Sequence, residues 1–239
     1  MKKYKYLALA AAVVLSIGGV IGGSLAWLSD DSEPVTNRFK PAKVDIILSE
    51  TDNGLDKDGN VNTNDYKMIP GWVLDKDPMV TVKNDSEDCW LFVKITESTA
   101  PDLDSYIAYK IAGLGTTESN DCWVEIDDGD NKEESVVIAR KVYATADTKT
   151  FNILGVGSYI FKNDTPEDES DDVTVSWKAN QVGVKPEVTE TMMEAITGEG
   201  KAQPTLTFDA YAVQLYKTNN VEFTALEAWN NNRRSRTTL

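Results

Sequence analysis

The sequence contains no histidine among its 239 residues. Serine and cysteine nucleophiles are usually activated by histidine, and peptidase zinc sites are usually built on histidine ligands. A pair of carboxylates can still hydrolyse a glycoside, but no motif selects a pair among the 39 acidic residues. The residue types therefore predict a protein that is not an enzyme.

Cysteine is scarce, and only Cys89 and Cys122 occur. Each follows an aspartate, precedes a tryptophan and begins a run that is typical of a β-strand. In an oxidising, exported setting such a pair usually forms a disulfide. A bridge is feasible if the two strands are neighbours in register, and the alternative is two small buried thiols.

Basic residues are outnumbered, with 24 lysines and arginines against 39 aspartates and glutamates and a formal net charge of −15. A surface this acidic repels nucleic acid and anionic lipid. The charge therefore predicts that nucleic acid is not a partner. The most acidic stretch, residues 164–172, is interpreted as a solvated hairpin loop, with weak cation binding as the alternative.

Long apolar runs are absent except near the N-terminus, where residues 7–22 follow three lysines. Ser24-Leu25-Ala26 is the small-x-small pattern that signal peptidases accept, so we predict a cut between Ala26 and Trp27. The alternative is an uncleaved anchor, although the run is short for a membrane span of about 20 residues. We expect a secreted protein that contacts the membrane only through the uncleaved signal.

The rest of the chain is dominated by short runs rich in Val, Ile, Thr, Tyr and Trp, separated by Gly, Asp and Asn. Because they do not alternate with helices, these runs predict an all-β, antiparallel sandwich. The expected organisation is a signal peptide (1–26), an N-terminal segment (27–40), a β-sandwich domain (41–218) and a C-terminal helix and tail (219–239). The predicted strands are residues 44–48, 79–83, 89–96, 106–111, 122–126, 135–143, 157–161, 173–178 and 205–216.

A few short helices are expected at the periphery of the sandwich. Residues 101–105 predict one turn of helix, and residues 187–197 predict a longer helix between a proline and a glycine. The packed stripe of this longer helix consists of Val188, Met192, Ala195 and Ile196.

A further helix is predicted close to the C-terminus. Thr224-Ala225-Leu226-Glu227 has the pattern of a capping box, in which the threonine and the glutamate satisfy each other's backbone N–H groups. Phe223 is placed to pack on Ala228, which puts Trp229 on the packed face of the helix.

Residues 56–65, DKDGNVNTND, form the one metal-like motif of the sequence. On a calcium loop of the EF-hand type, Gly59 takes the sharp turn and several oxygen donors fall at ligand positions. The first ligand position holds Gly54 in place of aspartate, so the site is incomplete, and a β-hairpin turn is the alternative. No cofactor other than calcium is suggested. The candidate calcium ligands are Asp56, Asp58, Asn60, Asn62 and Asp65.

Several stretches, in their order along the chain, resemble the TasA/camelysin family of Gram-positive bacteria. The signal ending GGVIGGSLAWLSD, followed by VTNRF and VDIILSE, is similar to the family's signal and first strand. YKMIPGWVLDKDPMVTVKN, DCWLFVKI, FDAYAVQ and EAW resemble its Pro-Gly turn, later strands and closing helix. The resemblance covers most of residues 14–97 and 205–230, whereas residues 98–204 depart from the family's pattern.

The resemblance implies a jelly-roll-like β-sandwich, processing by an ER-type signal peptidase and self-assembly into extracellular filaments of the biofilm matrix. In such filaments the freed N-terminus of one subunit adds a strand to the sheet of the next. The implied donor contacts are Trp27, Leu28, Val35 and Phe39.

Two other functions are kept as alternatives. Camelysin-type relatives are described as metal-dependent peptidases, and the absence of histidine argues against that activity here. A monomeric cell-surface adhesin that binds carbohydrate is the second alternative, and exposed tryptophans are the feature that favours it.

Overall fold

Short β-strands make up most of the described chain, and the few helices are short. The structure is a computed structural model that describes residues 43–52, 64–129, 134–162, 171–218 and 220–236. These residues lie within one unit, Ala42–Leu239. The prediction of an all-β protein is confirmed.

Short strands occur throughout the described residues. Their bounds are β1 Ile46–Ser49, β2 Val73–Asp75, β3 Met79–Val82, β4 Cys89–Glu97, β5 Ile107–Ala108, β6 Leu114–Gly115, β7 Trp123–Ile126, β8 Ser135–Val142, β9 Thr150–Asn152, β10 Gly157–Phe161, β11 Val173–Trp177, β12 Gln181–Val184, β13 Leu206–Gln214, β14 Tyr216–Thr218 and β15 Val221–Glu222. Each run predicted as a strand overlaps one of these strands. The strands that the sequence does not predict are two to four residues long, too short to show a period.

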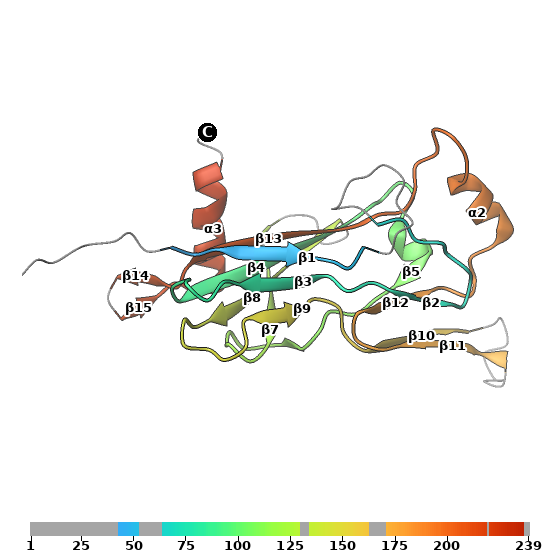
Figure 1. Cartoon of the computed structure of the whole chain (residues 1–239). Helices are drawn as coiled ribbons and strands as arrows, with labels where there is room; N and C mark the ends of the chain where they lie inside the picture. Colours follow the sequence, from blue (N-terminus) through green and yellow to red (C-terminus); the bar gives the residue numbers. More distant parts are fainter. Residues whose placement is uncertain (1–42, 53–63, 130–133, 163–170, 219, 237–239) are drawn as a thin grey trace, which may run out of the picture. The chain divides into compact units, whose positions relative to one another are not determined.

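The strands form several sheets, which Figure 1 shows. The largest has the order β13-β4-β8-β7-β6, and two others have the orders β1-β3-β9 and β2-β12-β5. Strands β10 and β11 form a two-stranded sheet, as do β14 and β15. Within the described residues every pair of these strands is antiparallel except β6 with β7.

The central strand β4 is buried on both of its faces. Leu91, Val93 and Ile95 point to one face and contribute to one apolar cluster, as the alternation predicts. Trp90 and Phe92 point to the opposite face and contribute to a second cluster. Because six of the nine residues of β4 are buried, this strand is central to the core of the molecule.

The first face of the five-stranded sheet is covered by the sheet β1-β3-β9. Val80 and Val82 of β3, together with Ile153, pack against Leu91, Val93 and Ile138. All of these side chains are at most 2% exposed. We call this face of the five-stranded sheet the sheet-covered face.

The second face is covered by helix α3, Ala225–Arg236. The predicted capping box is confirmed, because the Glu227 carboxylate accepts a hydrogen bond from the Thr224 N–H at 2.9 Å and the Thr224 hydroxyl accepts one from the Glu227 N–H at 3.3 Å. Trp229 is buried on the packed face, as predicted, and its ring lies 5.4 Å from that of Phe92; Phe223 and Ala228 belong to the same cluster. We call this side the helix-covered face.

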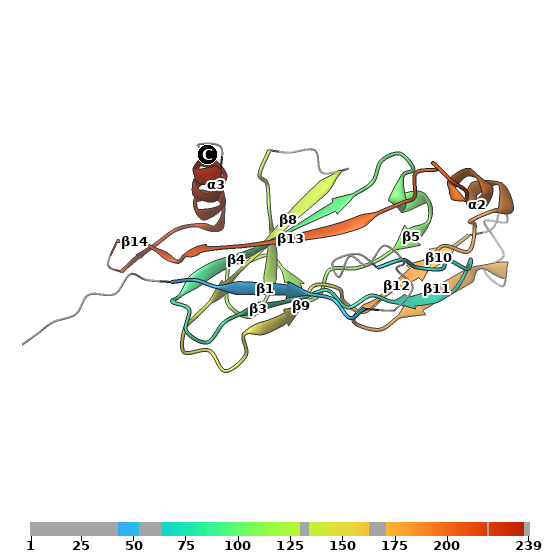
Figure 2. The ribbon, with the colours of Figure 1, turned by 45° about the horizontal axis from the view of Figure 1, so that its top comes forward.

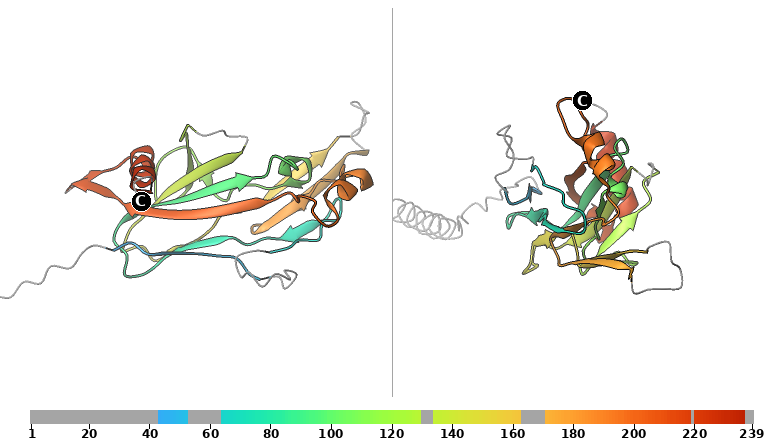
Figure 3. Two further views of the ribbon diagram at one scale, coloured as in Figure 1. Left: turned by 90° about the horizontal axis from the view of Figure 1, so that it is seen from above. Right: turned by 90° about the vertical axis from the view of Figure 1, so that its right-hand side faces the viewer.

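A third apolar cluster lies among β5, β12 and two further helical segments. One is the single turn Leu103–Ser105, and the other is α2, Glu190–Ile196. Val188 and Ile196 are buried in this cluster, as predicted, whereas Ala195 is exposed, so its placement on the packed stripe is wrong. Figures 1 and 3 show α2 and α3 at opposite ends of the described unit.

Candidate functional site

The predicted cleavage site and donor segment near the N-terminus lie wholly outside the described residues. This holds for the cleavage pair Ala26 and Trp27 and for the donor contacts Leu28, Val35 and Phe39. Their roles stay predictions.

The candidate calcium loop also falls largely outside the described chain. Asp56, Asp58, Asn60 and Asn62 are not described, and Asp65 is an exposed residue ahead of β2. Among the described residues no group of three or more acidic or cysteine side chains is arranged to hold a metal. The calcium site and the acidic stretch 164–172 stay predictions.

The two cysteines are free thiols in the structure. Cys89 begins β4 and belongs to the sheet-covered face, whereas Cys122 precedes β7 and packs against the helix-covered face. Strand β8 lies between β4 and β7, so the neighbouring register that a bridge requires is not present. Burial raises the pKa of the Cys89 thiol to about 12.

The first candidate site is an open seam, which we define as the adjoining outer edges of β1 and β13. The two strands lie beside each other but belong to different sheets (Figures 1 and 2). Strand β13 is nine residues long, and within the described ranges it pairs with β4 alone, as β1 pairs with β3 alone. A long edge strand with one partner is a template on which a further strand can pair.

The register shows which backbone groups face out of the seam. Leu215 donates its N–H to the Asp88 carbonyl, and Ser98 donates to the Thr205 carbonyl, so odd-numbered residues of β13 bond to β4. The N–H and C=O groups of the even-numbered residues therefore point away from β4. These outward-facing residues are Leu206, Phe208, Ala210, Ala212 and Gln214.

The side chains at the open seam are apolar and incompletely covered. Ile46 of β1 and Phe208 and Ala210 of β13 contact the cluster of the sheet-covered face but stay half-buried. Beside them Ile47 is 48% exposed and Leu48 is 38% exposed. The core is thus closed along β3, β4 and β8 but open where β1 and β13 meet, which leaves apolar surface for a partner to cover.

One end of the open seam is held by a charged pair. The Lys76 ammonium lies 3.0 Å and 3.1 Å from the two carboxylate oxygens of Glu50, just after β1. Tyr66 donates its hydroxyl hydrogen to the same carboxylate, and the ammonium lies 5.4 Å from the centre of the Phe208 ring. Burial, followed by the hydrogen bond to Glu50, raises the pKa of Tyr66, so its phenol is protonated at neutral pH.

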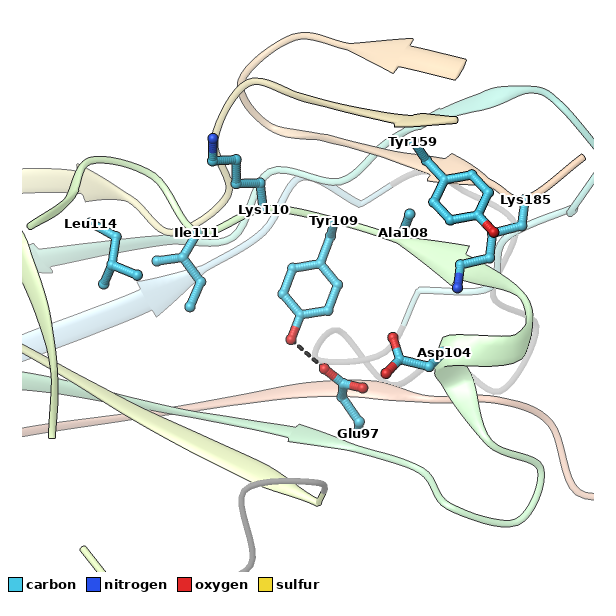
Figure 4. Close-up of a pocket in the computed structure, with 9 residues that line it drawn as sticks. All are labelled: Glu97, Asp104, Ala108, Tyr109, Lys110, Ile111, Leu114, Tyr159 and Lys185. Carbon is cyan, nitrogen blue, oxygen red and sulfur yellow. Dashed lines mark hydrogen bonds between the residues drawn. The ribbon is translucent and has the colours of Figure 1, made fainter. Parts of the chain in front are cut away.

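The second candidate site is a pocket of about 480 Å³, shown in Figure 4. Tyr109 and Tyr159 line it, with the carboxylates of Glu97 and Asp104 and the ammonium of Lys185 around them. Tyr109 donates its hydroxyl hydrogen to Glu97. The Lys185 ammonium lies 4.8 Å from the centre of the Tyr159 ring.

Electrostatics in this pocket keep its phenols neutral. Burial raises the pKa of the Glu97 carboxyl, against the opposing effect of the Tyr109 hydroxyl. Burial and the same hydrogen bond raise the pKa of Tyr109. A hydrogen bond to Glu187 raises the pKa of Tyr159 to about 12. Both tyrosines therefore present neutral aromatic rings and hydroxyl groups at physiological pH.

Sequence reasoning does not find this pocket. Tyr109 lies in a run predicted as a strand, and no motif links it to Tyr159 or Lys185, which are distant in the chain.

Trp72 is a further residue whose position is informative. It is 60% exposed, whereas Trp90 and Trp123 are buried. Because all three tryptophans lie in or beside predicted strands, core packing is the role that the sequence favours, and for Trp72 this expectation is wrong.

None of the helices in the described ranges is long and apolar enough to cross a membrane. Comparisons with family models, curated proteins and solved structures give no significant match to this chain.

Proposed function

We propose that the chain is a secreted structural subunit that assembles into extracellular filaments, with each subunit placing its N-terminal segment in the open seam of the next. The subunit acts without catalysis or a required cofactor. Its fold is proposed to be a jelly-roll-like sandwich of the TasA/camelysin type, on the basis of the sequence resemblance stated above and the packing of β1-β3-β9 against the five-stranded sheet.

The open seam is the observation that carries this proposal. It combines the two requirements of strand addition, which are unpaired backbone groups and apolar positions on alternate residues. The outward-facing residues of β13 supply the N–H and C=O groups. Half-buried side chains such as Phe208, Ala210 and Ile46 supply the apolar floor that a donor strand would cover.

The donor in this proposal is the segment 27–39, freed by cleavage after Ala26. Its apolar residues Trp27, Leu28, Val35 and Phe39 would occupy the apolar positions of the open seam. Pro34 interrupts the segment and separates an outer part from an inner part, because proline cannot donate to a ladder. Cleavage by an ER-type signal peptidase would release the segment from the membrane and thereby permit assembly.

A monomeric adhesin at the cell surface is the second candidate function. It is favoured by Trp72, which is 60% exposed in the turn before β2. An exposed indole offers a large apolar contact area for little loss of side-chain entropy, and tryptophan is enriched at binding interfaces for this reason. An adhesin of this kind stays monomeric at every concentration, which separates it from the filament subunit.

Deletion of residues 27–38 tests the proposed function. The truncated chain is expected to keep the circular dichroism and melting profile of the full mature chain, to elute as a monomer and to form no fibres in negative-stain electron microscopy. A synthetic peptide of residues 27–39 should bind the truncated chain, whereas a scrambled peptide of the same composition should not. Fibres from the truncated chain would show that the segment is not the donor.

A further inference from the structure

One end of the open seam lies at the turn between β3 and β4. Lys43, which leads into β1, is held there, because the Glu87 N–H donates to the Lys43 carbonyl at 3.0 Å. The end of β13 is held at the same turn, since Leu215 donates its N–H to the Asp88 carbonyl at 3.0 Å. The start of β1 and the end of β13 therefore lie together, and we call this end of the open seam the β14 end (Figures 1 and 2).

The opposite end of the open seam, where β1 ends and β13 begins, lies beside α2. Leu206, the first residue of β13, packs against the apolar cluster that contains Ile196 of α2. Val184 belongs to the same cluster and accepts a hydrogen bond from the Gly71 N–H, which places the turn of Trp72 at this end. We call it the α2 end. Strands β1 and β13 thus run in opposite directions between the two ends.

The length of chain between the proposed donor and β1 limits where the donating copy can lie. Residues 40–42 separate Phe39 from Lys43, and these four Cα steps span at most about 15 Å. The β14 end of the donating copy must therefore lie within about 15 Å of the point where the donor strand leaves its acceptor. That point is one of the two ends of the acceptor's seam, and the direction of the donor strand determines which.

A donor strand that leaves at the acceptor's β14 end does not build a filament. Every copy would then hold its β14 end within about 15 Å of the β14 end of the next copy. A domain of roughly 200 residues is more than about 30 Å across, so successive copies cannot stack at that spacing. Two copies that exchange segments in this direction would instead close into a dimer.

From this geometry we infer that the donor strand runs parallel to β1 and antiparallel to β13, so that the α2 end of one copy docks on the β14 end of the next. The inference rests on the proposed donor role of residues 27–39, and it adds the direction of the donor and a second contact between the same two copies. Such a contact joins two different surfaces and repeats without closing. The partner of the α2 end is therefore a second copy of this chain.

The surfaces at the two ends match in character. Trp72 is 60% exposed at the α2 end, and Tyr216 and Val221 are 36% and 49% exposed at the β14 end. Residues 187–199 contain four glutamates and no lysine or arginine. Helix α3, which the Lys217–Glu227 ion pair ties to β14, contains three arginines and one glutamate. Opposite charges and exposed apolar side chains favour this contact, whereas the net charge of −15 makes copies repel one another in general.

Crosslinking within fibres tests the direction of the donor. Fibres grown from an equal mixture of isotope-labelled and unlabelled mature chain are treated with a carbodiimide, which couples lysine to carboxylate side chains, and links between copies are recognised by their mixed labels in mass spectrometry. Lys40, directly after the donor, should link between copies to carboxylates of the α2 end, such as Glu97, which pairs with Leu206, and Glu199. Links between copies from Lys40 to Glu87 or Asp88, at the β14 end, would overturn the inference.

A second arm separates a wrong direction from a wrong donor. If residues 27–39 are not the donor, the chain that lacks residues 27–38 still forms fibres, and the proposed function fails together with this inference. If the deletion abolishes fibres while Lys40 links to the β14 end of another copy, the donor role stands and only the inferred direction is wrong. Closed dimers of the mature chain that require residues 27–38 would overturn the direction in the same way.

Charge reversal tests the docking of the two ends. Glu190→Arg with Glu194→Arg changes exposed positions of α2 and makes the net charge less negative, whereas Arg234→Glu with Arg236→Glu changes α3 and makes it more negative. Each pair should raise the critical concentration for fibre formation about tenfold, measured by sedimentation. All four changes in one chain should restore the wild-type value. Better assembly of the α2 pair than of the wild type, as net charge alone predicts, or no recovery in the fourfold variant, would contradict the docking.

Circular dichroism of each variant confirms that the fold is kept.

Discussion

The two faces of the five-stranded sheet are covered in different ways. On the helix-covered face one capped helix buries Trp90, Phe92 and Trp229 to 4% exposure or less. On the sheet-covered face the four-residue strands β1 and β3 cover the middle of the core but leave β13 half-exposed along its length. The same strand, β4, contributes to both faces.

The helix-covered face is complete within one subunit, whereas the sheet-covered face is left incomplete at the open seam. A helix satisfies its own backbone and can close a face alone, with a cap at its exposed end. A sheet that ends at an edge leaves backbone groups and apolar side chains uncovered. The helix-covered face therefore contributes to the stability of the single subunit, and the open seam is the site at which we propose assembly.

The largest expected effect is on the helix-covered face. Trp229→Ala removes a buried ring that contacts Phe92 and Tyr211, and it should lower the free energy of unfolding by about 3–5 kcal/mol. Phe208→Ala at the open seam removes a half-buried ring and should cost less than half as much in the monomer. Urea denaturation of both variants measures the difference, and equal losses would mean that the seam is as complete as the helix-covered face.

A proline in β13 should separate assembly from stability. The Ala210 N–H points out of the open seam, so Ala210→Pro removes a donor for an added strand without removing a bond to β4. The monomer should lose about 1–2 kcal/mol and form no fibres. Ala210→Ser keeps the N–H and should assemble. Fibres from Ala210→Pro, seen by electron microscopy, would place the acceptor edge elsewhere.

The cap of α3 should make stability depend on acid. The Lys217 ammonium and the Thr224 N–H lower the pKa of Glu227 from 4.5 to about 2. A lowered pKa stabilises the fold above about pH 4.5, and this contribution is lost as the pH falls toward 2. Glu227→Gln should therefore melt below the wild type at pH 7 and together with it near pH 2. A melting difference that persists at pH 2 would rule out the ionised carboxylate as its cause.

The last and smallest difference between the two faces concerns the reactivity of the two cysteine thiols, one at each face. Cys122 is half-buried and its thiol should react with a disulfide reagent in the native protein. Cys89 is fully buried with a thiol pKa of about 12, so it should react only on unfolding. Native thiol titration should therefore release one equivalent, with Cys122→Ser as the control that abolishes it. Two rapid equivalents would contradict the burial of Cys89.

The sequence predicts well those parts of the fold that depend on local pattern. The alternation of Leu91, Val93 and Ile95 places them on one face, and Thr224 with Glu227 marks the start of α3. Residues whose role depends on long-range pairing are not predictable in this way. The separation of Cys89 from Cys122 by β8, and the approach of Tyr109 to Tyr159 in one pocket, follow from strand order. Short strands such as β12, with a glycine in the middle, show no period at all.

Hydrogen exchange of the β13 amides, compared between monomer and fibre, tests the central claim most directly. The amides of Leu206, Phe208, Ala210 and Ala212 face out of the open seam. They should exchange rapidly in the monomer and become strongly protected in fibres, while the amides of the intervening residues are protected in both states. Equal exchange of the outward-facing amides in monomer and fibre would contradict strand addition at the open seam.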